Sequence, residues 1–105
     1  MANPYAGEVT VVIDGVRHNC KLTLGALAEL EAGLSTRSLV DLVRRFEDAA
    51  FSGADILAVV VAGLRGGGWQ GTAADLVRAD IAGGPMGAAR AAALLLARAF
   101  ALPDA

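Results

Sequence analysis

A repeated pair of polar residues divides this chain into short helices. A Ser or Thr is followed three positions later by an Asp three times, at Ser38/Asp41, Ser52/Asp55 and Thr72/Asp75. At this spacing the hydroxyl accepts a hydrogen bond from the backbone N–H of the third residue, and the carboxylate can accept one in return, which caps the start of a helix. The pattern therefore predicts three helices, over residues 38–50, 54–64 and 72–82.

Apolar spacing predicts two further helices, and glycines or prolines place the helix ends. Leucines at helical spacing after Thr23 predict a helix over 24–34, and an Ala/Leu-rich segment predicts one over 86–102 that Pro103 stops. Glycines at 66–68 and 83–84 end the two preceding helices. The helix over 54–64 is apolar almost all round, so we expect it to be central and the most buried.

Residues 8–23 are typical of a β-hairpin. Apolar Val9, Val11 and Ile13 occupy alternate positions, and Asp14-Gly15 is a strong two-residue turn signal. Because two strands alone are only marginally stable in water, the hairpin should lie on helices. The predicted fold class is α+β, with an N-terminal β-hairpin packed on a small bundle of four to five α-helices in one domain over 1–105.

Composition and charge exclude several classes of protein. Hydrophobic residues make up 55% of the 105, which excludes intrinsic disorder. The net charge of -2 lacks the cationic excess on which sequence-independent nucleic-acid binding relies, so we expect no nucleic acid partner. The longest apolar stretches, 56–64 and 91–97, are shorter than the roughly 18 residues of a spanning helix. Residues 1–8 lack the features of a signal peptide. We therefore expect a cytoplasmic protein with no membrane partner.

One glycine motif matches a nucleotide-binding pattern without its context. Residues Gly66–Gly71 spell G-x-G-x-x-G. A dinucleotide site needs these glycines to turn directly from a strand into a helix, with an acidic residue about 20 positions further on. The preceding segment carries a helix cap instead, and no parallel strand follows. We therefore predict no nucleotide cofactor.

A second candidate site is the pair His18 and Cys20, which share one face of the predicted hairpin. Together they could ligate a metal or act as a nucleophile and its base. The chain has no second His, and the nearest carboxylate in sequence is Asp14. A Cys–His dyad needs an orienting group and an oxyanion site, and a zinc cage needs more ligands. We expect structural roles for both residues, no metal or cofactor, and no enzymatic activity.

Four residues are candidates for contact with a protein partner: Arg44, Arg45, Arg65 and Trp69. Arg and Trp are enriched among the side chains that dominate binding energy at interfaces. Two alternatives stay open. The arginines of 38–50 can belong to a solvated helix face, and Trp69 can fold back over the core.

Three segments, taken in order, resemble a known family. After the hairpin come Thr23–Glu31 (TLGALAELE), then Ser38–Phe46 (SLVDLVRRF), then Ala62–Gly68 (AGLRGGG) at the end of an apolar helix. In this order and spacing they resemble the tail-assembly chaperones of gene transfer agents and long-tailed bacteriophages. The similarity extends from about Gly7 to the final helix.

The resemblance implies a non-enzymatic factor of the bacterial cytoplasm. Such a protein binds the tape measure protein, helps to recruit tail tube protein and is not retained in the particle; whether it forms a homo-oligomer stays open. One alternative is a structural tail component that stays in the particle, although tube subunits are usually β-rich. The other is a small helical DNA-binding regulator, against which the pI of about 5.2 argues.

Overall fold

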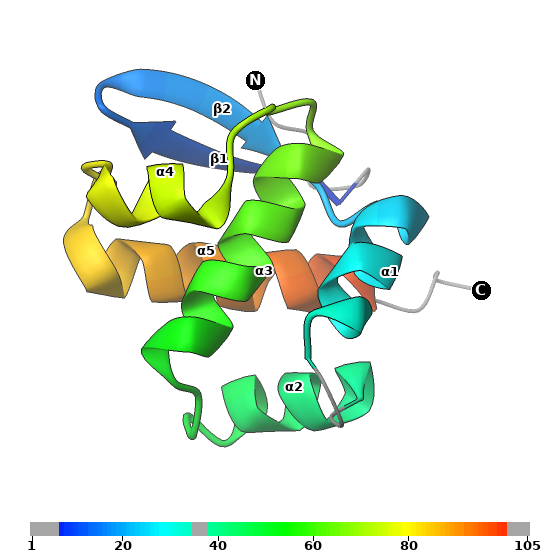
Figure 1. Ribbon diagram of the computed structural model, residues 1–105. Coiled ribbons are helices and arrows are strands. Elements are labelled where there is room, and N and C mark those ends of the chain that lie inside the picture. The colour runs from blue at the N-terminus through cyan, green and yellow to red at the C-terminus, as the bar shows by residue number, and fades with distance from the viewer. Residues whose placement is uncertain (1–6, 35–37, 101–105) are drawn as a thin grey trace.

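The computed structural model describes residues 7–34 and 38–100. Two antiparallel strands are followed by five helices, so the α+β prediction is confirmed (Figure 1). The elements are β1 (Val9–Ile13), β2 (Val16–Cys20), α1 (Leu24–Ala32), α2 (Leu39–Glu47), α3 (Gly53–Gly66), α4 (Ala73–Arg78) and α5 (Gly84–Ala99). The predicted end of the last helix, at 101–102 with Pro103, lies outside the described residues. Within the described ranges, none of the helices has the length and apolar character that crossing a membrane requires.

The hairpin has the predicted tight turn, and the chain itself contacts both of its edges. Asp14 and Gly15 adopt φ values of 50° and 81°, as a type I′ turn requires. At the β1 edge, the N–H of Ala82 donates to the carbonyl of Val12 at 3.0 Å. Just past β2, the N–H of Lys21 donates to the carbonyl of Gly63 in α3 at 2.9 Å. The two-stranded sheet is therefore joined to the segment between α4 and α5 on one side and, at the end of β2, to α3 on the other.

The predicted caps begin α2, α3 and α4. At Ser52/Asp55 and at Thr72/Asp75 both reciprocal hydrogen bonds form, and each carboxylate accepts the cap N–H at 2.8 Å. At the start of α2, the Ser38 hydroxyl accepts the N–H of Asp41 at 3.2 Å. The local sequence pattern therefore located the start of each of these helices.

Several predicted boundaries are wrong. Helix α1 ends at Ala32 rather than 34, where Gly33 caps it, and α2 ends at Glu47 rather than 50, because the chain turns at Ala49 with φ 53°.

Tertiary contacts account for two further differences. Helix α4 ends at Arg78 rather than 82, because residues 80–82 lie beside β1 and Ile13 bridges Ile81. Helix α3 continues to Gly66, since its last turn packs against the end of β2. Helix α5 begins at Gly84 rather than 86: Gly83 caps it at φ 86°, and the proline that follows fits the first turn.

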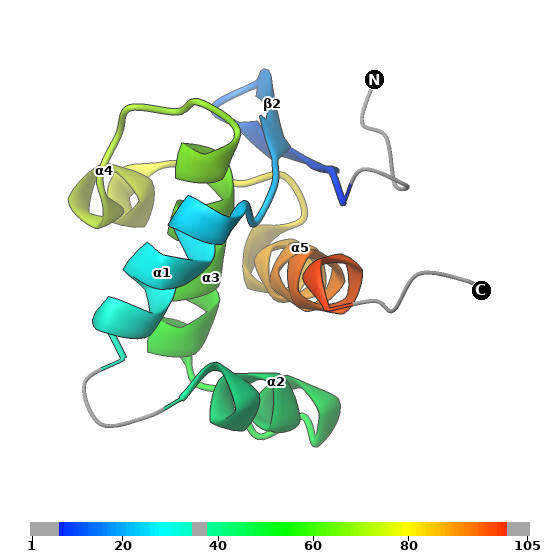
Figure 2. The same cartoon turned by 90° about the vertical axis from the view of Figure 1, so that its right-hand side faces the viewer.

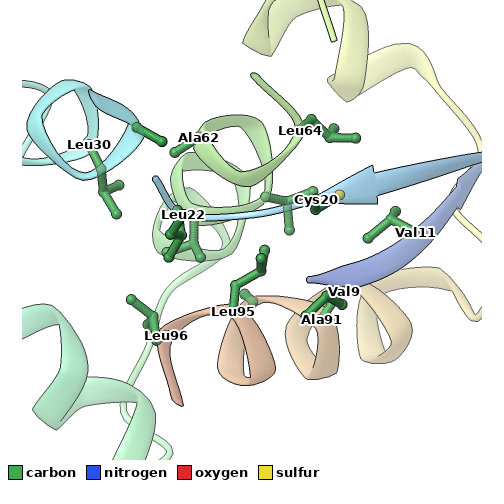
Figure 3. Packing of buried hydrophobic residues seen from close by; sticks show 14 of the residues in the cluster. Val9, Val11, Cys20, Leu22, Leu30, Ala62, Leu64, Ala91, Leu95 and Leu96 are labelled. Atoms are coloured by element: carbon green, nitrogen blue, oxygen red, sulfur yellow. The ribbon is translucent and has the colours of Figure 1, made fainter. Parts of the chain in front are cut away.

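Helix α3 is central, as its apolar sequence predicted. It packs against α1, α4, α5 and β2, and its Val59 and Leu64 have no exposed surface. In Figure 1 it runs across α5, and Figure 3 shows Leu95 of α5 pointing toward Leu22 and Cys20. The core consists of aliphatic side chains from β1 and all five helices, together with Cys20 from β2.

Glycines allow α3 to approach its neighbours closely. A Cβ atom at Gly66 would overlap the carbonyl oxygen of Lys21, and one at Gly67 would overlap that of Asn19. At Gly63 a Cβ would lie 2.6 Å from Cδ1 of Leu95. The segment Ala62–Gly68 is therefore a packing motif, in which the end of α3 rests on the backbone of the hairpin.

Candidate protein-binding surfaces

The loop after α3 is closed by its own backbone. The N–H of Gly68 donates to the carbonyl of Arg65 at 3.0 Å, and the N–H of Trp69 donates to that of Leu64 at 2.9 Å. The G-x-G-x-x-G match begins in the last turn of a helix, as the helix cap at Ser52 predicted, whereas a dinucleotide-binding turn follows a strand.

Arg65 connects this loop to α1. Its Nε donates to Glu29 Oε2 at 3.3 Å, and its Nη1 donates to the carbonyl of Gly71 at 3.2 Å. The side chains of Arg65 and Glu29 are 42% and 56% exposed, so the ion pair is solvated and contributes little to stability. Arg65 thus has partners within the chain and still presents its guanidinium at the surface.

Trp69 is partly buried and packs against the hydrophobic core. Its ring lies against Gly71 so closely that a Cβ there would overlap the indole. Trp69 therefore folds back against the core, which is one of the two interpretations that its sequence position allowed. A role in binding a partner stays a prediction.

Arg65 and Trp69 border one groove, which we call the α1–loop groove. It has a volume of about 470 Å³ and lies between the first turns of α1 and the loop after α3. The lining residues are Thr23, Gly25, Ala26, Glu29, Arg65, Gly66, Trp69 and Gln70. The groove is open and mixes a charged pair with an aromatic wall, which suits a protein contact.

The other two candidates, Arg44 and Arg45, lie on α2 at the opposite end of α3. Arg45 Nη2 forms an ion pair with Asp55 Oδ2 at 3.1 Å, and the Asp55 side chain is only 4% exposed. Asp55 lies about 15 Å along the helix from Arg65, at 1.5 Å per residue. The structure therefore separates the four candidates into two pairs, and Arg45 joins α2 to α3. Asp55, predicted only as a cap, was missed as the partner of Arg45, because nothing in the local pattern marks a contact between helices.

Arg44 is exposed on α2. Its contribution to a partner contact stays a prediction, like those of the other three candidates.

His18 and Cys20 differ in exposure: His18 is partly exposed, whereas Cys20 lies in the core. Cys20 is fully buried, and burial raises the pKa of its thiol from 9.0 to about 12. A thiol in this state is protonated at neutral pH and is neither a nucleophile nor a good metal ligand. Among residues 7–34 and 38–100, no group of three or more His, Cys, Asp or Glu side chains is placed to hold a metal ion.

A family model described as "Phage tail tube protein, GTA-gp10" matches residues 6–102. The match includes both strands and all five helices. The chain belongs to this family. No curated protein and no solved structure matches it significantly.

Membership in this family makes the chain a tail protein of the phage and gene transfer agent type, as the sequence resemblance predicted. Other tail proteins are the class of partner that the family indicates. The family description names a tail tube protein and does not mention a chaperone, so the chaperone role and the tape measure partner are not confirmed by the match.

Proposed function

We propose that this protein is a non-enzymatic tail-assembly chaperone that acts in the bacterial cytoplasm, binds the tape measure protein and assists assembly of the tail tube. One observation supports this role most: little of the sheet edge is open, so helical surfaces form most of what the chain offers to partners. Residues 80–82 pair with β1, and the last turn of α3 lies against the end of β2.

Whether the sheet edges are open distinguishes a subunit that pairs its sheet with the next copy from a protein that binds partners through its helices. A subunit that extends a sheet from one copy to the next needs an open strand edge. Here each strand has only five residues. Residues 80–82 pair with β1 and α3 contacts the end of β2, so only the part of β2 near the turn has an open edge. Helical faces and grooves suit the binding of a client segment instead. The α1–loop groove is one such surface, with Arg65 and Trp69 at its border.

A retained structural component of the tail is the second candidate, and the family description favours it because it names a tube protein. In that case the chain would contact neighbouring subunits permanently through helical faces. The two candidates differ in one observable, namely the amount of the protein in finished particles.

Co-expression with the tape measure protein encoded nearby tests the chaperone role. We expect the tape measure protein to become soluble and to co-purify with the tagged chain. Trp69→Ala should keep the domain folded and reduce co-purification, whereas Thr10→Ala, an exposed change on β1, should leave it unchanged. A tape measure protein that is equally insoluble with and without this chain would contradict the proposal. A large loss of thermal stability in Trp69→Ala would assign the indole to the core instead.

A further inference from the structure

Helix α5 has an outward face that is largely apolar. Side chains spaced four and three residues apart share this face, which we call the α5 seam: Met86, Arg90, Ala93, Ala97 and Phe100. All five are exposed, Met86 to 73% and Phe100 to 44%. Alternating spacings of four and three are those of a helix seam that packs on another helix. A helix that is apolar nearly all round is normally buried, yet this face is solvent-accessible.

Helix α2 borders the α5 seam and turns it into a groove. A hollow of about 310 Å³ is lined by Val43, Phe46, Glu47, Ala93, Leu96, Ala97 and Phe100. Figure 2 shows α5 nearly end-on, with α3 to one side of it and α2 below. The small side chains Ala93 and Ala97 allow the backbone of another helix to come close.

The charges beside the α5 seam have opposite signs on its two flanks. Leu96 faces α2, and Arg90 lies about 120° away around the α5 axis, on the other side of Ala93. Arg90 therefore borders the flank away from α2, while Glu47 of α2 borders the near flank. A helix that complements this groove carries an acidic residue toward Arg90 and a basic residue toward Glu47.

These charges disfavour a second copy of the chain as the occupant. Helix α5 contains Arg90 and Arg98 and no Asp or Glu. Two copies packed seam to seam with antiparallel α5 helices would bring their Arg90 flanks together on one side and their Glu47 flanks together on the other, so Arg90 would gain no acidic partner. A helix of another protein that carries an acidic residue can form an ion pair with Arg90.

We propose that the α5 seam binds an amphipathic α-helix of another tail protein. This helix has an apolar stripe, with an acidic residue facing Arg90 and a basic residue about two turns away facing Glu47. The proposal rests on the proposed function and adds the chemical character of the client segment.

Two synthetic peptides test the seam with the full chain. Both are roughly 18 residues long, about the length of α5, and share one Ala/Leu stripe. The first carries Glu and Lys two turns apart on opposite flanks, and the second carries Gln at both positions. In fluorescence anisotropy the charged peptide should bind about tenfold more tightly than the neutral one. Arg90→Glu should remove this advantage, and Arg78→Glu, an exposed change on α4 away from the groove, should preserve it.

A blocked seam provides the decisive control. Ala93→Gln/Ala97→Gln fills the groove with good helix formers at exposed positions, so the fold should persist while both peptides lose affinity. The proposal is overturned if neither peptide binds saturably, or if the blocked variant binds them unchanged. It is also overturned if sedimentation finds a dimer that this variant dissociates, because a second copy then occupies the seam.

The same variants separate this inference from the proposed function. If the blocked variant still recovers the tape measure protein in full, the seam is not the client site and the chaperone role survives. If the peptides bind as expected and the tape measure protein never co-purifies, the seam is a helix-binding surface and the chaperone role fails.

Discussion

Two adjacent glycines allow the end of α3 to touch the hairpin backbone. Gly66 and Gly67 face the carbonyl oxygens of Lys21 and Asn19, where no side chain fits. These glycines belong to Ala62–Gly68, one of the three segments that carry the resemblance to tail-assembly proteins. The motif is therefore explained by packing, with no need for a ligand.

Gly66→Ala should destabilise the protein by about 3 kcal/mol, because the added methyl group collides with backbone rather than with a side chain that can move. Gly25→Ala is the matched control: it has open space on exposed α1 and should be neutral or stabilising by about 0.5 kcal/mol. Urea denaturation measures both. Equal effects at the two positions would refute the packing role.

The buried thiol of Cys20 makes stability depend on alkaline pH. Its pKa is about 12 in the folded protein and 9.0 for an unperturbed thiol, so the unfolded chain loses this proton first as pH rises. The stabilisation is complete below pH 9 and is lost progressively between about pH 9 and 12. Free energies of unfolding measured across this range should decline more steeply for the native protein than for Cys20→Ser. Parallel curves would contradict the assignment.

At the scale of elements, α2 ends in a conformation that its sequence fits poorly. Ala49 has φ 53°, and the N–H of Ala50 donates to the carbonyl of Arg45 at 2.7 Å, as in the helix ending that usually places glycine at this point. Ala49→Gly should stabilise the protein by about 0.5 to 1 kcal/mol. Ala50→Gly, where φ is not positive, should destabilise it slightly. Thermal unfolding that ranks the two variants in the reverse order would refute this explanation.

The ion pair between Arg45 and Asp55 joins α2 to the central helix. Arg45→Leu removes one cationic partner of a carboxylate that is 4% exposed and that keeps its hydrogen bond from the Ser52 N–H, and we expect a loss of about 2 kcal/mol in the free energy of unfolding. Arg44→Leu, next to it on the exposed side of α2, should change stability by less than about 0.5 kcal/mol. Chemical denaturation of the two variants distinguishes a structural Arg45 from one that serves only a partner.

The sequence pattern predicted features set by local interactions. The Asp14-Gly15 turn and the caps at Ser38, Ser52 and Thr72 depend on residues at most three positions apart, so each could be identified without the fold. The early end of α4 depends on residues 80–82 meeting β1, far away in sequence.

The candidate site was less predictable for the same reason. Arg65 and Trp69 were placed beside one loop, but their groove also needs Glu29 of α1. The spacing of the α5 seam is visible in the sequence, yet an apolar stripe alone does not reveal which of its faces is exposed. Which faces are buried is decided by the arrangement of all the helices together.

At the scale of the whole molecule, helices surround the central helix α3, and a short hairpin that contacts the rest of the chain along β1 and at the end of β2 lies at one end (Figure 1). This architecture leaves open helical grooves as the surfaces for partners. It suits a protein that binds segments of other tail proteins while the tail is built, which is the proposed chaperone role.

The amount of this protein in purified particles tests that role most directly. Quantitative mass spectrometry should compare its copy number with that of the subunit that forms the tube wall. The chaperone role predicts that the protein is absent or far below the copy number of the tube subunit, while it is abundant in the producing cells. A copy number equal to that of the tube subunit would contradict the chaperone role and establish a structural component of the tail.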